Sequence, residues 1–155
     1  MSPEQHKDPV ELLAGIKLFR NLNREELSII ADLLVLQNVG AAHEIFAEGD
    51  PGGIMIIISS GLVEIQKSKS HGSEKIIMAR FESGSLIGEI SLIDGMLRSA
   101  TAVTIEPTTF YYLTQASMEF LIENEKDIAI KLLRDLAILI SLRLRHTSGW
   151  FADVL

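Results

Sequence analysis

Cysteine is absent from the 155 residues. Its absence excludes disulfide bonds, cysteine-ligated zinc sites and iron–sulfur clusters, and with them redox sensing by such a cluster. Long apolar runs are missing too, because the longest, residues 54–58 and 136–140, are far too short to span a membrane. The polar first residues show no signal peptide. We therefore expect a cytoplasmic protein without a membrane partner.

Positive charge is also scarce, since 14 Lys and Arg residues stand against 21 Asp and Glu residues, for a net charge of −7. Non-specific binding to nucleic acid needs clustered Lys and Arg, so nucleic acid is not an expected partner. The four histidines share no ligand spacing, and we expect no metal cofactor. With 47% hydrophobic and 23% charged residues, the composition is that of one globular domain with its own core.

Helical periodicity appears at both ends of the chain. After a tail that we expect to be flexible, residues 1–9, apolar residues recur at helical spacing. A second helix is predicted after Asn23, which has the sequence pattern of a capping box with Glu26. Thr114 is predicted to cap the first of two C-terminal helices, which together cover residues 115–146.

Between the helices the pattern changes to short strands separated by glycine turns, from about residue 36 onward. Residues 49–53 lack the Lys-Ser/Thr of a triphosphate-binding loop, so a hairpin turn is expected there. A strand is predicted to begin at Arg98. The prediction is a mostly β fold with flanking helices, a double-stranded β-helix (jelly-roll) barrel in a single domain, residues 10–155.

The last helix, expected over residues 126–146, is unusually apolar. Two stripes run along it: Leu132, Leu136 and Leu139, and then Leu133, Ala137, Ile140 and Leu144. A helix with one face on its own domain needs only one stripe. Self-pairing of the helix accounts for the second, so we predict a homodimer through residues 126–146. The alternative is a long helix that its own barrel covers more fully.

The residues with chemical potential gather in the stretch 84–101. Gly88 and Glu89 begin a short helical turn that Gly95 ends, and Arg98 follows. Free N–H groups at a helix start and a planar guanidinium suit a phosphate. Glu89 repels phosphate, but a carboxylate accepts well from a neighbouring hydroxyl. A ribose 3′,5′-cyclic monophosphate offers both groups. An ordinary ion pair of Arg98 with Glu89 or Asp94 is the alternative.

This pattern resembles the phosphate-binding cassette of the cyclic nucleotide-binding domain family, which includes cAMP receptor proteins and protein kinase A regulatory subunits. The motifs concerned are Gly88-Glu89, Ser91-Leu92, Arg98-Ser99-Ala100-Thr101, Phe46-x-Glu48-Gly49-Asp50, Ile56-x-Ile58-x-x-Gly61-x-Val63 and Leu18-Phe19-x-x-Leu22. They span roughly residues 10 to 145. The chain departs from the family at Leu97 and Ile87, where Pro and Phe are common.

The resemblance implies a cyclic nucleotide ligand, with cAMP favoured over cGMP. The ligand-binding residues that it implies are Gly88, Glu89, Ile90, Ser91, Arg98, Ser99 and Ala100. Arg98 is expected to hold the phosphate and Glu89 a ribose hydroxyl, while Gly88 and Ile90 offer backbone N–H groups. Ser99 is a candidate to contact a phosphate oxygen or the edge of the purine. The alternative is a strand hydroxyl that contacts no ligand.

The purine contact is open between two registers. Aligned without gaps, the family's hydroxyl pair falls at Arg143-Leu144, which carries no hydroxyl; by local likeness it falls at Thr147 and Ser148. Gly149 is expected to end the last helix. Trp150 is then predicted to lie over the purine as a lid, or to plug the barrel or the dimer seam.

No nucleophile with a base and an orienting group emerges, so we expect no enzyme. The leading hypothesis is a non-catalytic sensor that relays binding through its C-terminal helices to a separate effector protein. Transcription factors of the family carry a DNA-binding domain after this point, and none is expected before Leu155. The alternatives are a ligand-free structural or interaction module of the same fold, and a sensor of another small effector such as haem.

Overall fold

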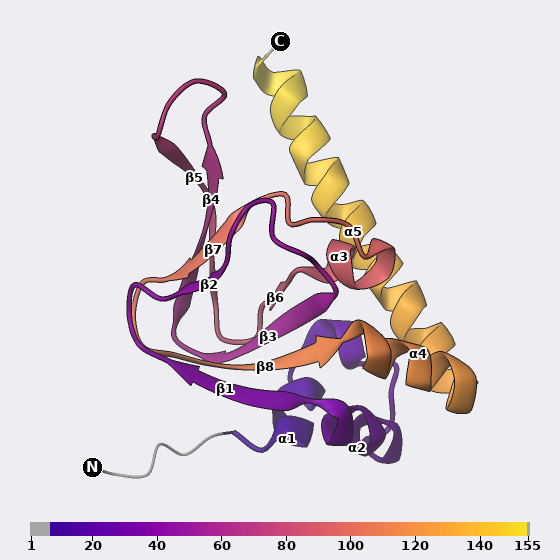
Figure 1. The fold of residues 1–155 in the computed structure, drawn as a ribbon. Coiled ribbons are helices and arrows are strands. Elements are labelled where there is room, and N and C mark those ends of the chain that lie inside the picture. The colour runs from indigo at the N-terminus through magenta and orange to yellow at the C-terminus, as the bar shows by residue number, and fades with distance from the viewer. Residues whose placement is uncertain (1–6, 155) are drawn as a thin grey trace.

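The computed structural model describes the backbone of residues 7–154 and the side chains of residues 7–147. Its strands form two antiparallel sheets that face each other (Figure 1). One sheet has the order β1 (Val35–Val39), β8 (Thr108–Thr114), β3 (Ile54–Ser60) and β6 (Leu86–Ile87). The other has the order β2 (Glu44–Phe46), β7 (Thr101–Thr104), β4 (Leu62–Ser68) and β5 (Lys75–Glu82). The predicted mostly β jelly roll with flanking helices is confirmed.

Helices from both ends of the chain pack together against one face of the β1–β8–β3–β6 sheet (Figure 1). The N-terminal group is α1 (Pro9–Ala14), the 3₁₀ turn η1 (Lys17–Phe19) and α2 (Arg24–Leu33). A short helix, α3 (Glu89–Asp94), interrupts the strands, and α4 (Gln115–Asn124) and α5 (Lys126–Val154) end the chain. Two predicted caps are confirmed: Asn23 and Glu26 form a reciprocal capping box, and the Thr114 hydroxyl accepts from the Ser117 amide.

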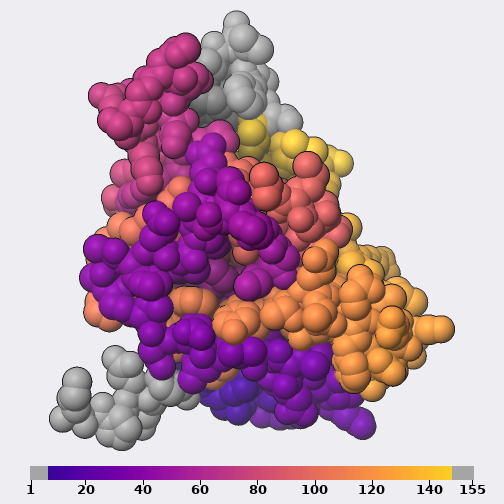
Figure 2. Space-filling model, viewed as in Figure 1, coloured from indigo at the N-terminus to yellow at the C-terminus, as the bar shows by residue number. Residues whose placement is uncertain are grey.

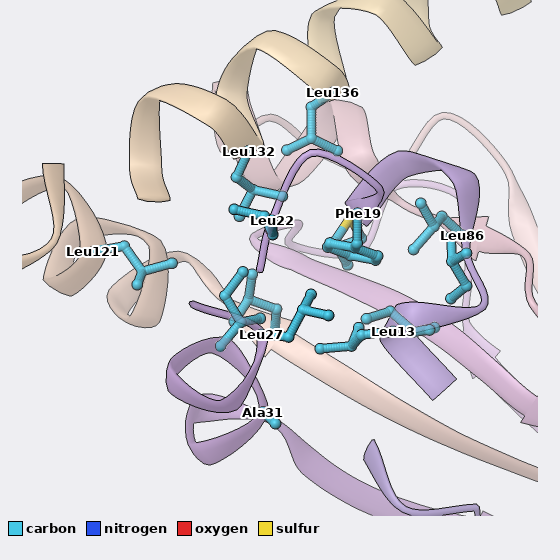
Figure 3. Packing of buried hydrophobic residues seen from close by; sticks show 14 of the residues in the cluster. Leu13, Phe19, Leu22, Leu27, Ala31, Leu86, Leu121, Leu132 and Leu136 are labelled. Atoms are coloured by element: carbon cyan, nitrogen blue, oxygen red, sulfur yellow. The ribbon is translucent and has the colours of Figure 1, made fainter. Parts of the chain in front are cut away.

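Buried apolar side chains form two clusters, one on each face of β3. The larger lies between the sheet and the helices of both chain ends (Figure 3); its most deeply buried members include Leu13, Phe19, Ile30, Leu121, Leu132 and Leu136. The smaller fills the barrel and contains Ile56, Ile58, Val63, Ile87, Ala102 and Phe110. Strand β3 feeds both clusters alternately, because successive side chains of a strand point to opposite faces.

The two ends of the chain differ from the predictions. Most of the expected tail, residues 1–9, lies outside the described residues, and α1 already begins at Pro9. The expected helix end at Gly149 is wrong, because α5 continues to Val154. A single glycine costs a helix only about 1 kcal/mol relative to alanine, which is too little to end a long helix. Among the described helices, none combines the length and apolarity needed to cross a membrane.

Two predictions within the barrel are also wrong. Arg98 does not open a strand, since β7 begins at Thr101. The Arg98 backbone is instead bonded to the preceding loop: its N–H donates to Asp50 O, and its C=O accepts from Gly49 N. Residues 49–53 are not a hairpin turn, because β2 and β3 belong to different sheets and the loop crosses between them.

The overall shape places α5 beside the cassette. Figure 1 shows α5 leaving α4, passing α3 and extending beyond the barrel, while the β4–β5 hairpin projects on the same end of the molecule. The projecting hairpin is also evident in the space-filling view (Figure 2). Helix α5 is therefore positioned to contact any site built on α3.

Candidate functional site

Two glycines bound helix α3 and fix its position. Gly88 has φ +85° and Gly95 has φ +66°, a left-handed conformation that side chains rarely adopt. Gly88 is doubly constrained, because a Cβ there would lie 2.6 Å from Arg98 Nη1 and 2.8 Å from Ile54 O. The chain therefore turns sharply into α3 directly against the Arg98 guanidinium. The predicted bounds of the helical turn, Gly88 and Gly95, are confirmed.

Arg98 is a buried cation whose partners are neutral. Only 7% of the residue is exposed. Its Nη1 donates to Ser91 Oγ at 2.6 Å and its Nη2 to Ile54 O at 2.8 Å, while the Phe46 ring lies 4.1 Å from Cζ. Its Nε is buried without a hydrogen-bond partner in the described part of the chain. Burial lowers the pKa of Arg98, an effect that the charge of Asp50 partly offsets.

The ion pair between Arg98 and Glu89 or Asp94, considered as an alternative, is not formed among the described side chains. A buried charge normally has a counter-charge, because desolvation of a lone ion is costly. Within the described part of the chain, Arg98 therefore lacks an anionic partner, and its Nε–H is available to donate to one.

Glu89 is held by the C-terminal helix. The residue is 4% exposed, and its Oε1 accepts from Arg143 Nη1 at 2.6 Å. Arg143 is anchored further, because its Nη2 donates to Leu86 O at 2.8 Å and its Cζ lies 5.3 Å from the centre of the Phe81 ring. The carboxylate that the sequence assigns to a ribose hydroxyl thus already carries a charge-assisted hydrogen bond to α5.

These residues surround a cavity of about 410 Å³, a size typical of small-molecule sites. All seven cassette residues singled out in the sequence line it: Gly88, Glu89, Ile90, Ser91, Arg98, Ser99 and Ala100. Apolar side chains, including Phe46, Ile65 and Phe81, line it as well. The cavity thus combines charged and polar groups suited to a sugar phosphate with apolar surface suited to a flat ring.

The two C-terminal candidates differ from the cassette residues. Thr147 is exposed, is not among the cavity residues, and donates its hydroxyl to Arg143 O at 3.0 Å. Its contact with the purine stays a prediction. Trp150 falls in α5, but its side chain lies outside the described residues. The hypothesis that it covers the purine as a lid therefore stays a prediction.

Sequence reasoning missed the roles of Arg143 and Gly52. Arg143 stands at the gapless position of the family's purine contact, but it has no hydroxyl, and no local pattern in the sequence indicates its bond to Glu89. Gly52 packs against α3, where a Cβ would lie 2.6 Å from Ser91 Cβ and 2.3 Å from Met96 O. The unusual run of glycines around Pro51 was the available signal for such a close approach. Over the side chains that the structure describes, no group of three or more His, Cys, Asp or Glu could hold a metal ion.

A jelly roll that buries an arginine beside a glycine-bounded helix, around a cavity of this size, has the architecture of a small-ligand-binding domain. Comparison with known families gives the particular one, because the family described as "Cyclic nucleotide-binding domain" matches residues 36–125. The chain belongs to this family.

Individual relatives agree with the assignment. The chain is 29% identical over 145 residues to the CRP-like cAMP-activated global transcriptional regulator of Mycobacterium tuberculosis, covering 94% of this chain and 62% of that protein. It is 31% identical over 134 residues to the cyclic AMP receptor protein of Thermus thermophilus, covering 86% of this chain and 60% of that protein. The chain thus spans about three fifths of these curated relatives.

A solved structure also matches closely. The crystal structure of a cyclic nucleotide-binding domain from Methylobacillus flagellatus superposes with a TM-score of 0.84 at 28% sequence identity, covering 97% of this chain and 84% of that one. The likeness extends over both sheets and the flanking helices, which supports the jelly-roll assignment.

Proposed function

We propose that this chain is a non-catalytic sensor that binds a 3′,5′-cyclic nucleotide, with cAMP favoured over cGMP. The observation that carries the proposal is Arg98, a buried guanidinium that lines the cavity. Among the described residues it bonds only to neutral groups and its Nε–H has no partner. The family and the names of the relatives, two of which refer to cAMP, support the choice of ligand.

In the proposed complex the cyclic phosphate lies against Arg98 and the N–H groups at the start of α3. The ribose 2′-hydroxyl donates to Glu89, and the purine occupies the apolar part of the cavity. A phosphate supplies the counter-charge that Arg98 lacks, and a charge-assisted bond to a guanidinium is about twice as strong as a neutral one.

The Glu89–Arg143 bond supports the proposed relay to the C-terminal helix. A ribose hydroxyl at Glu89 competes with Arg143 for the same carboxylate. In the proposal, binding loosens Arg143 and lets α5 change its packing against α3. The ligand then shifts the equilibrium between two positions of α5, and the size of the shift is set by the difference in its affinity for the two.

Homodimerisation through α5 is the second part of the proposal. Leu132 and Leu136, from the first apolar stripe, are buried in the chain's own core. The second stripe is not: Leu144 is 65% exposed and Leu133 and Ile140 are half-buried. Ile130, 64% exposed, extends this stripe to the spacing 130, 133, 137, 140 and 144. Such alternating steps of three and four are the pattern of a coiled-coil seam.

The experiment is an equilibrium titration by calorimetry with cAMP, cGMP and 5′-AMP. The proposal expects saturable binding of cAMP, weaker binding of cGMP and little binding of 5′-AMP, whose phosphate is not cyclic and carries more charge. A protein that binds none of the three is the ligand-free interaction module instead. Comparing 2′-deoxy-cAMP with cAMP tests Glu89, because loss of the hydroxyl should weaken binding to the wild type but barely affect Glu89→Gln.

A further inference from the structure

A second hollow lies between η1 and α5, and it shares no residue with the nucleotide cavity. Its volume is about 650 Å³. One wall comes from residues 17–21 and the other from residues 131–142 of α5. We call it the η1–α5 groove. This volume can hold several side chains of a partner. The chemistry of the lining residues indicates which kind of partner fits.

Four of the residues that line the groove are apolar, and we call them its apolar floor. Leu18 and Leu139 are partly buried and pack on the main core, while Ile138 and Leu142, one helical turn apart, are 50% and 60% exposed. Ile138 and Leu142 do not belong to the seam proposed for the dimer, so helix pairing leaves them uncovered. Neighbouring exposed apolar groups in a hollow are typical of an interaction site.

Four cationic residues line the groove beside the apolar ones. Lys17, Arg20 and Arg134 are exposed and form no ion pair within the described residues. Lys131 is the exception, because its Nζ lies 2.7 Å from Glu26 Oε1. The one lining carboxylate is that of Asp135, which is 7% exposed and accepts from Asn21 Nδ2 at 3.3 Å.

The groove is thus cationic on a chain whose net charge is −7. Free cations around an apolar floor complement a partner that is apolar on one side and acidic on the other. A concave site between two helical segments suits a rod-like element, and helix-in-groove recognition uses apolar anchors at helical spacing. A small free anion would leave the floor uncovered, and a flat lipid surface would not reach into the hollow.

We propose that the η1–α5 groove binds an acidic amphipathic helix of a partner protein. Apolar anchors of that helix cover Ile138 and Leu142, and its carboxylates meet Lys17, Arg20 and Arg134. Charge complementarity of this kind speeds association and selects the partner.

The groove and the nucleotide cavity share α5, since Arg143 follows the groove wall on the same helix. We therefore expect a nucleotide that loosens Arg143 to change the affinity of the groove for its partner helix. By linkage, the partner helix then changes the affinity for the nucleotide by the same factor. This coupling rests on the proposed sensor function; the binding of the helix itself does not.

The test uses the 155-residue chain and a fluorescent peptide of roughly 18 residues, about five helical turns, with leucines along one face and glutamates elsewhere. Anisotropy should show saturable binding. The double variant Arg20→Glu/Arg134→Glu should weaken it by about tenfold or more, and Ile138→Asp should weaken it as well. Arg145→Glu, on the same helix but outside the groove, is the matched control and should leave binding close to wild type. Circular dichroism confirms that each variant is folded.

Other outcomes overturn the proposal. Equal binding of a scrambled peptide of the same composition indicates attraction by charge alone. Binding to vesicles containing phosphatidylserine that Arg20→Glu/Arg134→Glu abolishes, with no peptide binding, makes the groove a lipid site. A change of oligomeric state in Ile138→Asp makes its occupant a second copy of this chain. Calorimetry with cAMP on the same samples separates the two proposals, because peptide binding without cAMP binding refutes the sensor and leaves the groove standing.

Discussion

The Arg143 guanidinium on α5 lies 2.6 Å from the carboxylate of Glu89, the first residue of α3. The Glu89 side chain is buried, with 5% of it exposed, and the Arg143 side chain is half-buried, with 35% exposed. Glu89 has no second hydrogen bond among the described side chains, so the C-terminal helix satisfies the carboxylate that we assign to the ribose. The ligand site and the relay element therefore share one bond.

Arg143→Ala should increase the affinity for cAMP by about three- to tenfold, because a partly exposed ion pair that competes with the ligand is removed. The buried Glu89 carboxylate then lacks a partner until a ribose hydroxyl arrives. Calorimetry measures the change, with Arg145→Ala as the control. A loss of affinity in Arg143→Ala would show that Arg143 supports the bound ligand and does not compete with it.

Arg98→Met should cost about 2–4 kcal/mol of cAMP binding, since the charge that faces the phosphate disappears. The same variant should not lower the thermal stability of the ligand-free protein, because replacing a buried, poorly compensated charge by an apolar side chain is often neutral or stabilising. Calorimetry and thermal unfolding without ligand measure the two effects. Unchanged affinity, or a large drop in Tm, would contradict the role given to Arg98.

Gly88→Ala and Gly84→Ala form a matched pair. Both glycines have positive φ, +85° and +88°, but a Cβ at Gly84 meets nothing within 4 Å, whereas one at Gly88 meets Arg98 Nη1 at 2.6 Å. Each alanine should cost about 1–2 kcal/mol of stability through backbone strain. Gly88→Ala should cost more than Gly84→Ala, because its Cβ would also lie 2.8 Å from Ile54 O. Only Gly88→Ala should also weaken cAMP binding strongly. Denaturant unfolding and calorimetry test this, and equal binding by both variants would refute the steric argument.

Leu144→Glu should convert the proposed dimer to a monomer, because it places a charge in the seam at a position that is 65% exposed in the single chain. Light scattering at micromolar concentration should report twice the 17.1 kDa chain mass for the wild type and the single mass for the variant. Leu142→Glu, exposed on α5 outside the seam, is the control. A wild-type monomer would refute the pairing.

Glu26 should contribute to acid sensitivity. Its hydrogen bond to Lys131, followed by that to the Asn23 amide, lowers the pKa of Glu26 below its ordinary value of 4.5. A carboxyl whose pKa is depressed by folding stabilises the protein above its unfolded pKa, and this stability is lost as pH falls through the folded pKa. The stability gap between wild type and Glu26→Gln should therefore be present at pH 7 and shrink below about pH 4.5. A gap independent of pH would contradict this.

Local signals in the sequence predicted much of the fold and of the cassette. Asn23 and Glu26 cap α2 because both partners of the capping box lie within four residues, and Gly88 and Gly95 bound α3 because left-handed turns favour glycine. Contacts across long separations were not predictable. The Arg143–Glu89 bond joins residues 54 positions apart. The backbone of Arg98 lies outside β7, where it is hydrogen-bonded to Gly49 and Asp50.

The central claim is that Arg98 holds the phosphate of a cyclic nucleotide, and its unpaired Nε–H gives the most direct test. In a ¹H–¹⁵N spectrum of the arginine Nε–H groups, the Arg98 signal is assigned by its loss in Arg98→Lys. Titration with cAMP should move this signal downfield in a saturable way, while adenosine, which lacks the phosphate, should not move it. A protein that binds cAMP with the Arg98 Nε–H signal unmoved, or that does not bind cAMP at all, would contradict the account.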